Sequence, residues 1–171
     1  MLHKTIKDSD LSLDFPAPAV YEERIASRGV IFDDDRKVAL LNVSNKFYHK
    51  LPGGGVNIGE SLVEAFKREA MEEIGCHIGN IQELGIIEEY RNNLSLHQMS
   101  HGFTARIVGE KGMPKLEQEE IEEGLQTVWL TLDEAIRTIE SEKGVEDYEG
   151  KFIQMRDLIL LNETKNSASR N

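Results

Sequence analysis

The stretch from Leu51 to Cys76 constrains the fold more than any other part of the sequence. Three consecutive glycines stand near its start, and glycine permits backbone conformations and close approaches that other residues do not. Ser61 followed three residues later by Glu64 has the spacing of a helix capping box, and Gly75 is a typical helix stop. The sequence therefore predicts a glycine-rich loop that leads into a helix over Leu62–Ile74.

The predicted helix carries two kinds of side chain on one meridian, because successive residues turn by about 100°. Apolar side chains begin this stripe: Leu62, Ala65 and Phe66. Carboxylates continue it: Glu69, Glu72 and Glu73. Burying three neighbouring carboxylates is unfavourable unless a cation compensates their charge. Oxygen ligands at this helical spacing suit Mg²⁺ or Mn²⁺, so the stripe indicates a divalent metal site.

A simpler interpretation treats these carboxylates as a solvated helix face. Arg68 would then form an ordinary ion pair with Glu64 or Glu72, one turn away on the same helix. The glycines before the helix favour the metal interpretation, because they bring main-chain groups close enough to contact a metal or a phosphate. The loop is not a P-loop, since no Gly-Lys-Ser/Thr sequence follows the glycines.

Taken together, the segment resembles the Nudix box, the sequence motif of the MutT-like Nudix hydrolases. That motif runs glycine, five residues, glutamate, seven residues, then Arg-Glu-aliphatic-x-Glu-Glu-x-Gly-aliphatic. The residues in register with it are Gly54, Glu60, Arg68, Glu69, Glu72, Glu73 and Gly75. Two departures, the small Ala70 and Cys76 in place of the last aliphatic residue, remove no ligand. The resemblance covers roughly Arg24 to Glu140.

The resemblance implies an α/β protein with the Nudix fold, an α/β/α sandwich around a mixed β-sheet. It also implies Mg²⁺-dependent hydrolysis of the diphosphate linkage in a nucleoside diphosphate joined to another group, with Mn²⁺ as the alternative metal. The implied metal ligands are Glu69, Glu72, Glu73 and the carbonyl of Gly54. The implied catalytic residues are Glu72 or Glu73 as proton acceptor, and Arg68, which orients the glutamates. Glu60 braces the junction of loop and helix, and the structural part of the motif also includes Gly53, Gly55 and Gly75.

Four residues outside the helix are candidates for contact with the substrate. Phe47 and Tyr48 lie shortly before the glycines and either stack on a nucleobase or pack beneath the loop. Glu120 and Glu123 belong to an acidic stretch on a later loop, where the family can place the base or an additional metal ligand. The alternative for these two glutamates is a solvated surface.

Residues outside the box narrow the choice of substrate. Arg91 and Asn92 stand where many ADP-ribose hydrolases have a proline, and Tyr90 is slightly early for the tyrosine of dinucleoside polyphosphate hydrolases. The segment Val43–Leu51 lacks the arginines of coenzyme A hydrolases. A nucleoside triphosphate, including an oxidised or other non-standard one, is therefore the leading substrate. ADP-ribose or a nucleotide sugar is the alternative, and so is a nucleotide-sensing module without catalysis, although no box glutamate is lost.

The rest of the chain predicts one domain in which strands and helices are interleaved. Two strands around an acidic turn suggest a hairpin, and three more follow the box; the expected strands are Arg24–Phe32, Lys37–Val43, Leu84–Tyr90, Gln98–Val108 and Leu125–Leu130. Thr131 with Glu134 starts a second helix, and apolar residues between Phe152 and Leu161 indicate a third. We expect an N-terminal arm without a sustained period at residues 1–20, a Nudix hydrolase domain at residues 21–162, and a polar tail that frays at residues 163–171.

Composition limits the location and the partners of this domain. The chain has 171 residues, 39% of them hydrophobic, and a formal net charge of −11. No apolar run approaches the roughly 20 residues of a membrane-spanning helix, and the N-terminus lacks the apolar stretch of a signal peptide. A single cysteine fits a reducing cytoplasm. Because the chain is acidic, we expect a small nucleotide rather than a nucleic-acid polymer as its ligand, and no membrane partner; a homodimer is consistent with the family.

Overall fold

The computed structural model describes residues 1–143 and 145–169. Its strands form a mixed eight-stranded sheet with the order β1-β6-β7-β2-β3-β4, while β5 pairs with β2 and β8 pairs with β3. The strands are β1 (Leu2–Lys7), β2 (Glu22–Phe32), β3 (Lys37–Val43), β4 (Tyr48–Lys50), β5 (Gly53–Gly55), β6 (His77–Arg91), β7 (Leu96–Val108) and β8 (Leu125–Thr131). The α-helices are α1 (Leu62–Ile74), α2 (Gln118–Glu122), α3 (Leu132–Ser141) and α4 (Tyr148–Ala168), and short 3₁₀ turns lie at Asp8–Leu11 and Asn92–Leu94.

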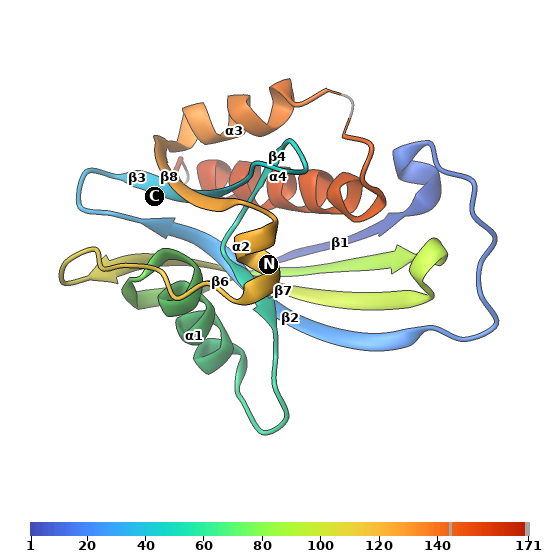
Figure 1. The fold of residues 1–171 in the computed structure, drawn as a ribbon, viewed down its shortest axis with the longest axis horizontal. Helices are drawn as coiled ribbons and strands as arrows, with labels where there is room; N and C mark the ends of the chain where they lie inside the picture. Colours follow the sequence, from blue (N-terminus) through green and yellow to red (C-terminus); the bar gives the residue numbers. More distant parts are fainter. Residues whose placement is uncertain (144, 170–171) are drawn as a thin grey trace.

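The sheet separates two layers of helices (Figure 1). α1 packs on one side of it, and α3 and α4 pack on the other. Neighbouring residues of the central strands point alternately into the two cores: Ile31 and Ala39 into the core with α1, Val30 and Val38 into the core with α3 and α4. Burial on both faces explains why these strands are continuous apolar runs. The expected α/β/α sandwich around a mixed sheet is therefore confirmed.

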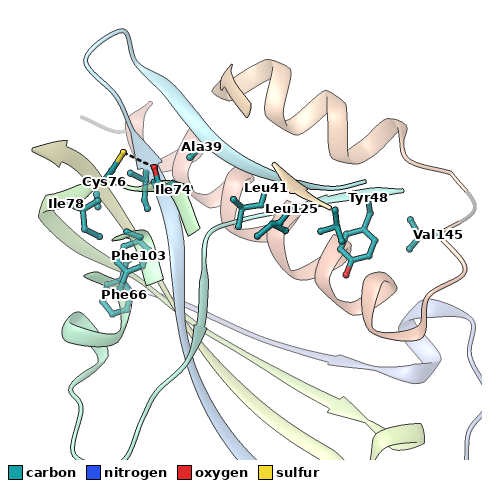
Figure 2. Close-up of a cluster of buried hydrophobic side chains, with 14 residues drawn as sticks. Ala39, Leu41, Tyr48, Phe66, Ile74, Cys76, Ile78, Phe103, Leu125 and Val145 are labelled. Atoms are coloured by element: carbon teal, nitrogen blue, oxygen red, sulfur yellow. Dashed lines mark hydrogen bonds between the residues drawn. The ribbon is translucent and has the colours of Figure 1, made fainter. Parts of the chain in front are cut away.

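The core beneath α1 fixes the position of that helix (Figure 2). Phe66 of α1 stacks on Phe103 of β7, with ring centroids 5.7 Å apart. Ile74 and Cys76, at the end of the helix, are buried in the same core. The Cys76 thiol donates a hydrogen bond to the carbonyl of Ile74 at 3.3 Å, and burial raises the pKa of this thiol. Packing of the apolar stripe thus determines where the carboxylates of α1 lie.

The pairing of β2 and β3 differs from the predicted hairpin. The acidic turn between them is present, since the amide of Asp33 donates to the carbonyl of Lys37 at 2.8 Å. Beyond this turn the two strands share one register pair, Phe32 with Val38. β2 instead runs parallel to β7, and β3 pairs antiparallel with β8. The main partners of both strands are distant in sequence, so local patterning does not reveal them.

The first part of the arm predicted for residues 1–20 belongs to the sheet, because it forms β1. This strand pairs in parallel with β6, from Leu2 opposite Gly85 to Lys7 opposite Tyr90. Ile6 is its one buried side chain. An edge strand that buries a single residue has no two-residue hydrophobic period, and this explains why the sequence does not signal it.

The predicted fraying of residues 163–171 is wrong as far as the structure describes them, because α4 continues to Ala168. Thr164 is buried on this helix, and its hydroxyl donates to the carbonyl of Leu160 at 2.8 Å. This bond satisfies a polar side chain inside the helix, so a polar sequence does not end it. Residues 170 and 171 lie outside the described residues. None of the helices that the structure describes is long and apolar enough to cross a membrane.

Candidate active site

The helix α1 begins and ends at the predicted residues. Ser61 accepts a hydrogen bond from the Glu64 amide at 3.2 Å, and the Glu64 carboxylate accepts one from the Ser61 amide at 2.8 Å. Gly75 closes the helix in the left-handed conformation, with a φ of 67°. A Cβ at this position would also lie 2.5 Å from the backbone of Met113. The helix is therefore fixed at both ends, and its carboxylates are held in place.

The three glycines form the short strand β5, which lies between β2 and α1. β5 pairs antiparallel with β2, with Gly54 opposite Ser27. Gly53 has a φ of 137°, and a Cβ there would lie 2.3 Å from the Cβ of Arg28. A Cβ on Gly54 would lie 2.4 Å from Oε1 of Glu69. Because these side chains are missing, the Glu69 carboxylate lies directly against the main chain of β5.

Glu73 is the most deeply buried carboxylate of α1, with 2% of its surface exposed. Its Oε2 accepts a hydrogen bond from the Gly53 amide at 2.6 Å, and its Oε1 lies 3.8 Å from Nζ of Lys50. Burial raises the pKa of Glu73 to about 8; Lys50 opposes this shift, and the negative charges of Glu69 and Glu120 add to it. Burial also raises the pKa of Glu69. A solvated helix face therefore does not describe these two carboxylates.

Arg68 connects the carboxylates of α1 to the segment before the helix. Its guanidinium donates to both carboxylate oxygens of Glu60, at 2.8 and 3.0 Å. It also donates to Glu69 at 2.7 Å, to Glu72 at 3.0 Å and to the carbonyl of Gly55 at 2.9 Å. One side chain thus contacts three box glutamates and the glycine strand at once. The ion pair with Glu72 is only one part of this arrangement.

A cleft of about 280 Å³ opens beside these carboxylates. One wall consists of the glycines of β5 together with Glu69 and Glu73, which we call the carboxylate wall. A second acidic group comes from α2 and its flanks: Glu117, Glu119, Glu120 and Glu123. Basic side chains also line the cleft: Arg24, Arg28, Lys46, Lys50, Arg91 and Arg156. The cleft is therefore polarised, with carboxylates and cations contributed mainly by different elements.

Three of the four predicted substrate-contact residues line this cleft. Glu120 and Glu123 face it from α2 and the residue after it, and Glu123 pairs with Lys46 at 2.6 Å. Tyr48 also lines the cleft, but only 3% of its surface is exposed because it belongs to the core. Phe47 is 84% exposed and is not among the residues that line the cleft. Its side chain therefore neither packs beneath the loop nor faces the site in this structure.

The basic residues of the cleft are the functional candidates that sequence analysis misses. Arg28 lies within the apolar run of β2 with 5% of its surface exposed, and Arg156 lies among apolar residues of α4 with 1% exposed. Arginine is almost never buried to this degree unless it has a partner. An arginine inside an apolar run is the signal that could have identified both. The sequence alone does not show that two such distant residues line one cleft.

The carboxylate wall and Glu72 offer a donor set that fits a divalent cation. Among the described residues no three His, Cys, Asp or Glu side chains are gathered as a formed metal site; Arg68 holds Glu69 and Glu72, and Glu73 faces Gly53. All of these donors are oxygen atoms, which Mg²⁺ and Mn²⁺ prefer. The Glu69 carboxylate fills the space where a Gly54 side chain would be, so it lies against the main chain at Gly54. The raised pKa values of Glu69 and Glu73 reflect buried negative charge that a cation stabilises.

Comparison with known proteins agrees with this geometry. The family model of the NUDIX domain matches residues 22–154. A NUDIX hydrolase from Nitrosomonas europaea superimposes with a TM-score of 0.56 at 21% identity, covering 77% of this chain and 88% of that one. A MutT NUDIX hydrolase from Burkholderia pseudomallei superimposes with a TM-score of 0.52 at 21% identity, covering 66% of this chain and 85% of that one. A search of curated protein sequences finds no significant match.

Proposed function

Because the chain belongs to the NUDIX family of pyrophosphohydrolases, we propose that it hydrolyses the diphosphate linkage of a nucleotide in a reaction that depends on Mg²⁺ or Mn²⁺. The favoured substrate is a nucleoside triphosphate, standard or oxidised, and the products are a nucleoside monophosphate and pyrophosphate. The observation that best supports this proposal is the close packing of the α1 carboxylates against the glycine backbone in the wall of the cleft.

Each residue of the box has a defined task in this reaction. Glu69, Glu72, Glu73 and the carbonyl of Gly54 would hold the metal ion, which neutralises phosphate oxygens and lowers the pKa of the attacking water. Glu72 or Glu73 accepts the proton of that water. Arg68 orients Glu69 and Glu72 through its two hydrogen bonds, and it anchors Glu60 at the start of the helix. The amide of Gly53 holds the Glu73 carboxylate at 2.6 Å.

The charge distribution of the cleft favours a triphosphate over the alternatives. ADP-ribose and nucleotide sugars place a neutral sugar beyond the diphosphate, whereas a triphosphate places a further phosphate there. Six basic side chains line the cleft together with seven carboxylates, and several of these form ion pairs with one another. Arg28 has no carboxylate of the described residues within ion-pair distance, so it suits the additional negative charge. All box glutamates are retained, which argues against a sensing module without catalysis.

The single cysteine, which is buried, fits our further proposal that the enzyme works in the cytoplasm.

A substrate panel tests the proposal. Nucleoside triphosphates, ADP-ribose, a nucleotide sugar and diadenosine polyphosphates are incubated with the protein in Mg²⁺, in Mn²⁺ and in EDTA. Phosphate release is measured with added pyrophosphatase to detect pyrophosphate, and in parallel with added phosphatase to detect monoester products. We expect metal-dependent release of pyrophosphate from a nucleoside triphosphate.

The outcomes of this panel separate the alternatives. Turnover of ADP-ribose or a nucleotide sugar with no turnover of any triphosphate would replace the proposed substrate class. Absence of turnover on the whole panel, in a folded protein that binds nucleotides, would favour the sensing module. Turnover that persists in EDTA would contradict the metal requirement.

A further inference from the structure

Arg28 is a buried guanidinium without a partner among the residues that the structure describes. It lies in β2 with 5% of its surface exposed and lines the cleft. Its Nε has no hydrogen-bond partner, and no carboxylate of the described residues lies within ion-pair distance of its guanidinium. A buried charge without compensation is destabilising. Such a group is expected to persist only where something else stabilises it.

The carboxylates near Arg28 are engaged by other side chains. Nε of Arg156 donates to Asp157 at 2.7 Å, and its Nη1 lies 3.6 Å from Glu89. Arg91 donates to Glu89 at 3.2 Å. We call these five residues the buried charge cluster: Arg28, Arg91, Arg156, Glu89 and Asp157. It contains three cations and two buried anions, and Arg91 also donates to the partly exposed Glu149 at 3.3 Å. Arg28 is the one cation of this cluster with no carboxylate of the described residues within ion-pair distance.

Both carboxylates also accept hydrogen bonds from groups other than the arginines. Glu89 accepts a hydrogen bond from Gln98 at 2.7 Å, and Asp157 accepts one from the Leu51 amide at 2.7 Å. Burial, followed by the neighbouring charge of Arg156, lowers the pKa of Arg28 to about 9. Arg28 therefore remains protonated at neutral pH. Arg91 Nε and Arg156 Nη2 are buried donors without partners as well, so the cluster as a whole lacks acceptors.

Arg28 lies next to the carboxylate wall. It is opposite Gly53 in the register of β2 and β5, and the amide of Gly53 holds the Glu73 carboxylate. The Leu51 amide, which contacts Asp157 of the charge cluster, is two residues before Gly53, a span of about 7 Å at most. A ligand in the cleft therefore meets carboxylates on one side and a guanidinium without partner within the reach of a short polyphosphate.

We propose that Arg28 binds the terminal phosphate of a nucleoside triphosphate directly, while the carboxylate wall acts on the linkage between its α- and β-phosphates. This inference rests on the proposed function and adds a residue that distinguishes the phosphate of a triphosphate from the neutral sugar of ADP-ribose. The planar guanidinium suits a phosphate because it donates two parallel hydrogen bonds. The phosphate supplies the acceptors and the negative charge that the cluster lacks.

Binding of inorganic pyrophosphate, the product that contains the terminal phosphate, tests this assignment. Calorimetry in Mg²⁺ compares the wild type with Arg28→Met, Arg28→Lys and the control Arg137→Met, an exposed arginine on α3. We expect Arg28→Met to weaken pyrophosphate binding roughly 10- to 100-fold, as for a lost hydrogen bond to a charged group. Arg28→Lys retains the charge but not the paired donors, so its affinity should be intermediate. The control and the affinity for a nucleoside monophosphate should stay within about twofold, below 0.5 kcal/mol.

Two further measurements separate binding from a structural role. In steady-state kinetics Arg28→Met should raise KM for the triphosphate more than it lowers kcat. Its melting temperature should equal or exceed that of the wild type, because the substitution removes an uncompensated buried charge. If Arg28→Met does not fold, the folded Arg28→Lys variant decides the question. Unchanged pyrophosphate affinity in a folded variant would overturn the assignment, and so would a loss confined to the nucleoside monophosphate.

Failure of this inference and failure of the proposed function give different results. Pyrophosphate binding that depends on Arg28, in a protein that hydrolyses no triphosphate, would support the phosphate site and refute the proposed reaction. Triphosphate hydrolysis in which Arg28→Met has wild-type KM and pyrophosphate affinity would refute only the role of Arg28.

Discussion

Two buried glutamates, Glu73 in the carboxylate wall and Glu89 in the buried charge cluster, have pKa values shifted in opposite directions. Their exposed fractions are 2% and 0%. Burial raises the pKa of Glu73 to about 8, and the nearby carboxylates add to this effect. Burial also disfavours the charged form of Glu89, but Arg156, Arg91 and Arg28 together lower its pKa below the ordinary value. The ionised form of a glutamate is thus disfavoured in the carboxylate wall and favoured in the buried charge cluster.

The two regions therefore differ in the sign of the charge that the protein leaves uncompensated. The carboxylate wall holds negative charge that the protein itself compensates incompletely, which prepares it for a cation. The charge cluster compensates its carboxylates and leaves a guanidinium over, which prepares it for an anion. Removing one carboxylate from each region should therefore affect different properties.

The largest effect is expected from Glu73→Gln, which should lower kcat about 100-fold or more because the substitution removes a proposed metal ligand and one of the two candidate proton acceptors. Stability should stay the same or increase, since the amide oxygen still accepts the Gly53 hydrogen bond and the substitution removes a carboxyl group whose charged form burial disfavours. Steady-state turnover and thermal unfolding measure the two properties. Glu140→Gln, on the exposed face of α3, is the control. Full activity of Glu73→Gln would refute its place in the site.

The reverse result is expected from Glu89→Gln. This substitution removes the carboxylate that Arg156 and Arg91 share, while Arg156 keeps Asp157 and Arg91 keeps Glu149. We therefore expect a loss near the lower end of the about 3–5 kcal/mol that breaking a buried ion pair typically costs. Urea unfolding measures this loss of stability, and Glu140→Gln again serves as control. The double variant Glu89→Gln with Arg91→Met should recover part of the loss, because it also removes the cation whose buried partner was Glu89 and leaves only the partly exposed Glu149 without that arginine. A Glu89→Gln variant as stable as the wild type would show that the ion pairs of Glu89 do not stabilise the fold.

Substitutions at two adjacent glycines of β5 should separate an effect on stability from an effect on turnover. Gly53→Ala should destabilise the protein by about 1–3 kcal/mol, because φ is 137° and the new Cβ meets the backbone of Arg28 at 2.4 Å. Gly54→Ala meets only the end of the Glu69 side chain, at 2.4 Å, which can rotate away. We therefore expect Gly54→Ala to stay within about 1 kcal/mol of wild-type stability and to lose roughly 10-fold in kcat through displaced Glu69. Each variant is the control for the other in unfolding and turnover measurements.

The sequence predicts the carboxylate wall far better than the charge cluster, and the reason is locality. The bounds of α1 follow from signals next to it in the chain, the capping residues Ser61 and Glu64 and the stop at Gly75. The charge cluster brings together β2, β6 and α4, whose pairing is not encoded in any short segment. Arg28 and Arg156 stand out as charges in apolar runs, but only the fold shows that they meet.

The smallest effect is expected in the pH dependence of stability. The direction of the pKa shift of Glu89, opposite to that of Glu73, determines how stability changes with pH. Because the pKa of folded Glu89 lies below its ordinary value of 4.5, this group stabilises the protein above that pH and loses its contribution as pH falls further. The stability difference between the wild type and Glu89→Gln should therefore be constant near neutral pH and shrink in acid below about 4.5. Urea unfolding of both proteins between pH 7 and pH 3 provides this difference, in which the titrations of all other carboxylates cancel. If this stability difference instead grows as the pH falls, the arginines do not stabilise the charged form of Glu89. Arg91 and Arg156 would then also be cations without a stabilising partner in Glu89, and Arg28 would not be the only cation of the cluster left for a ligand.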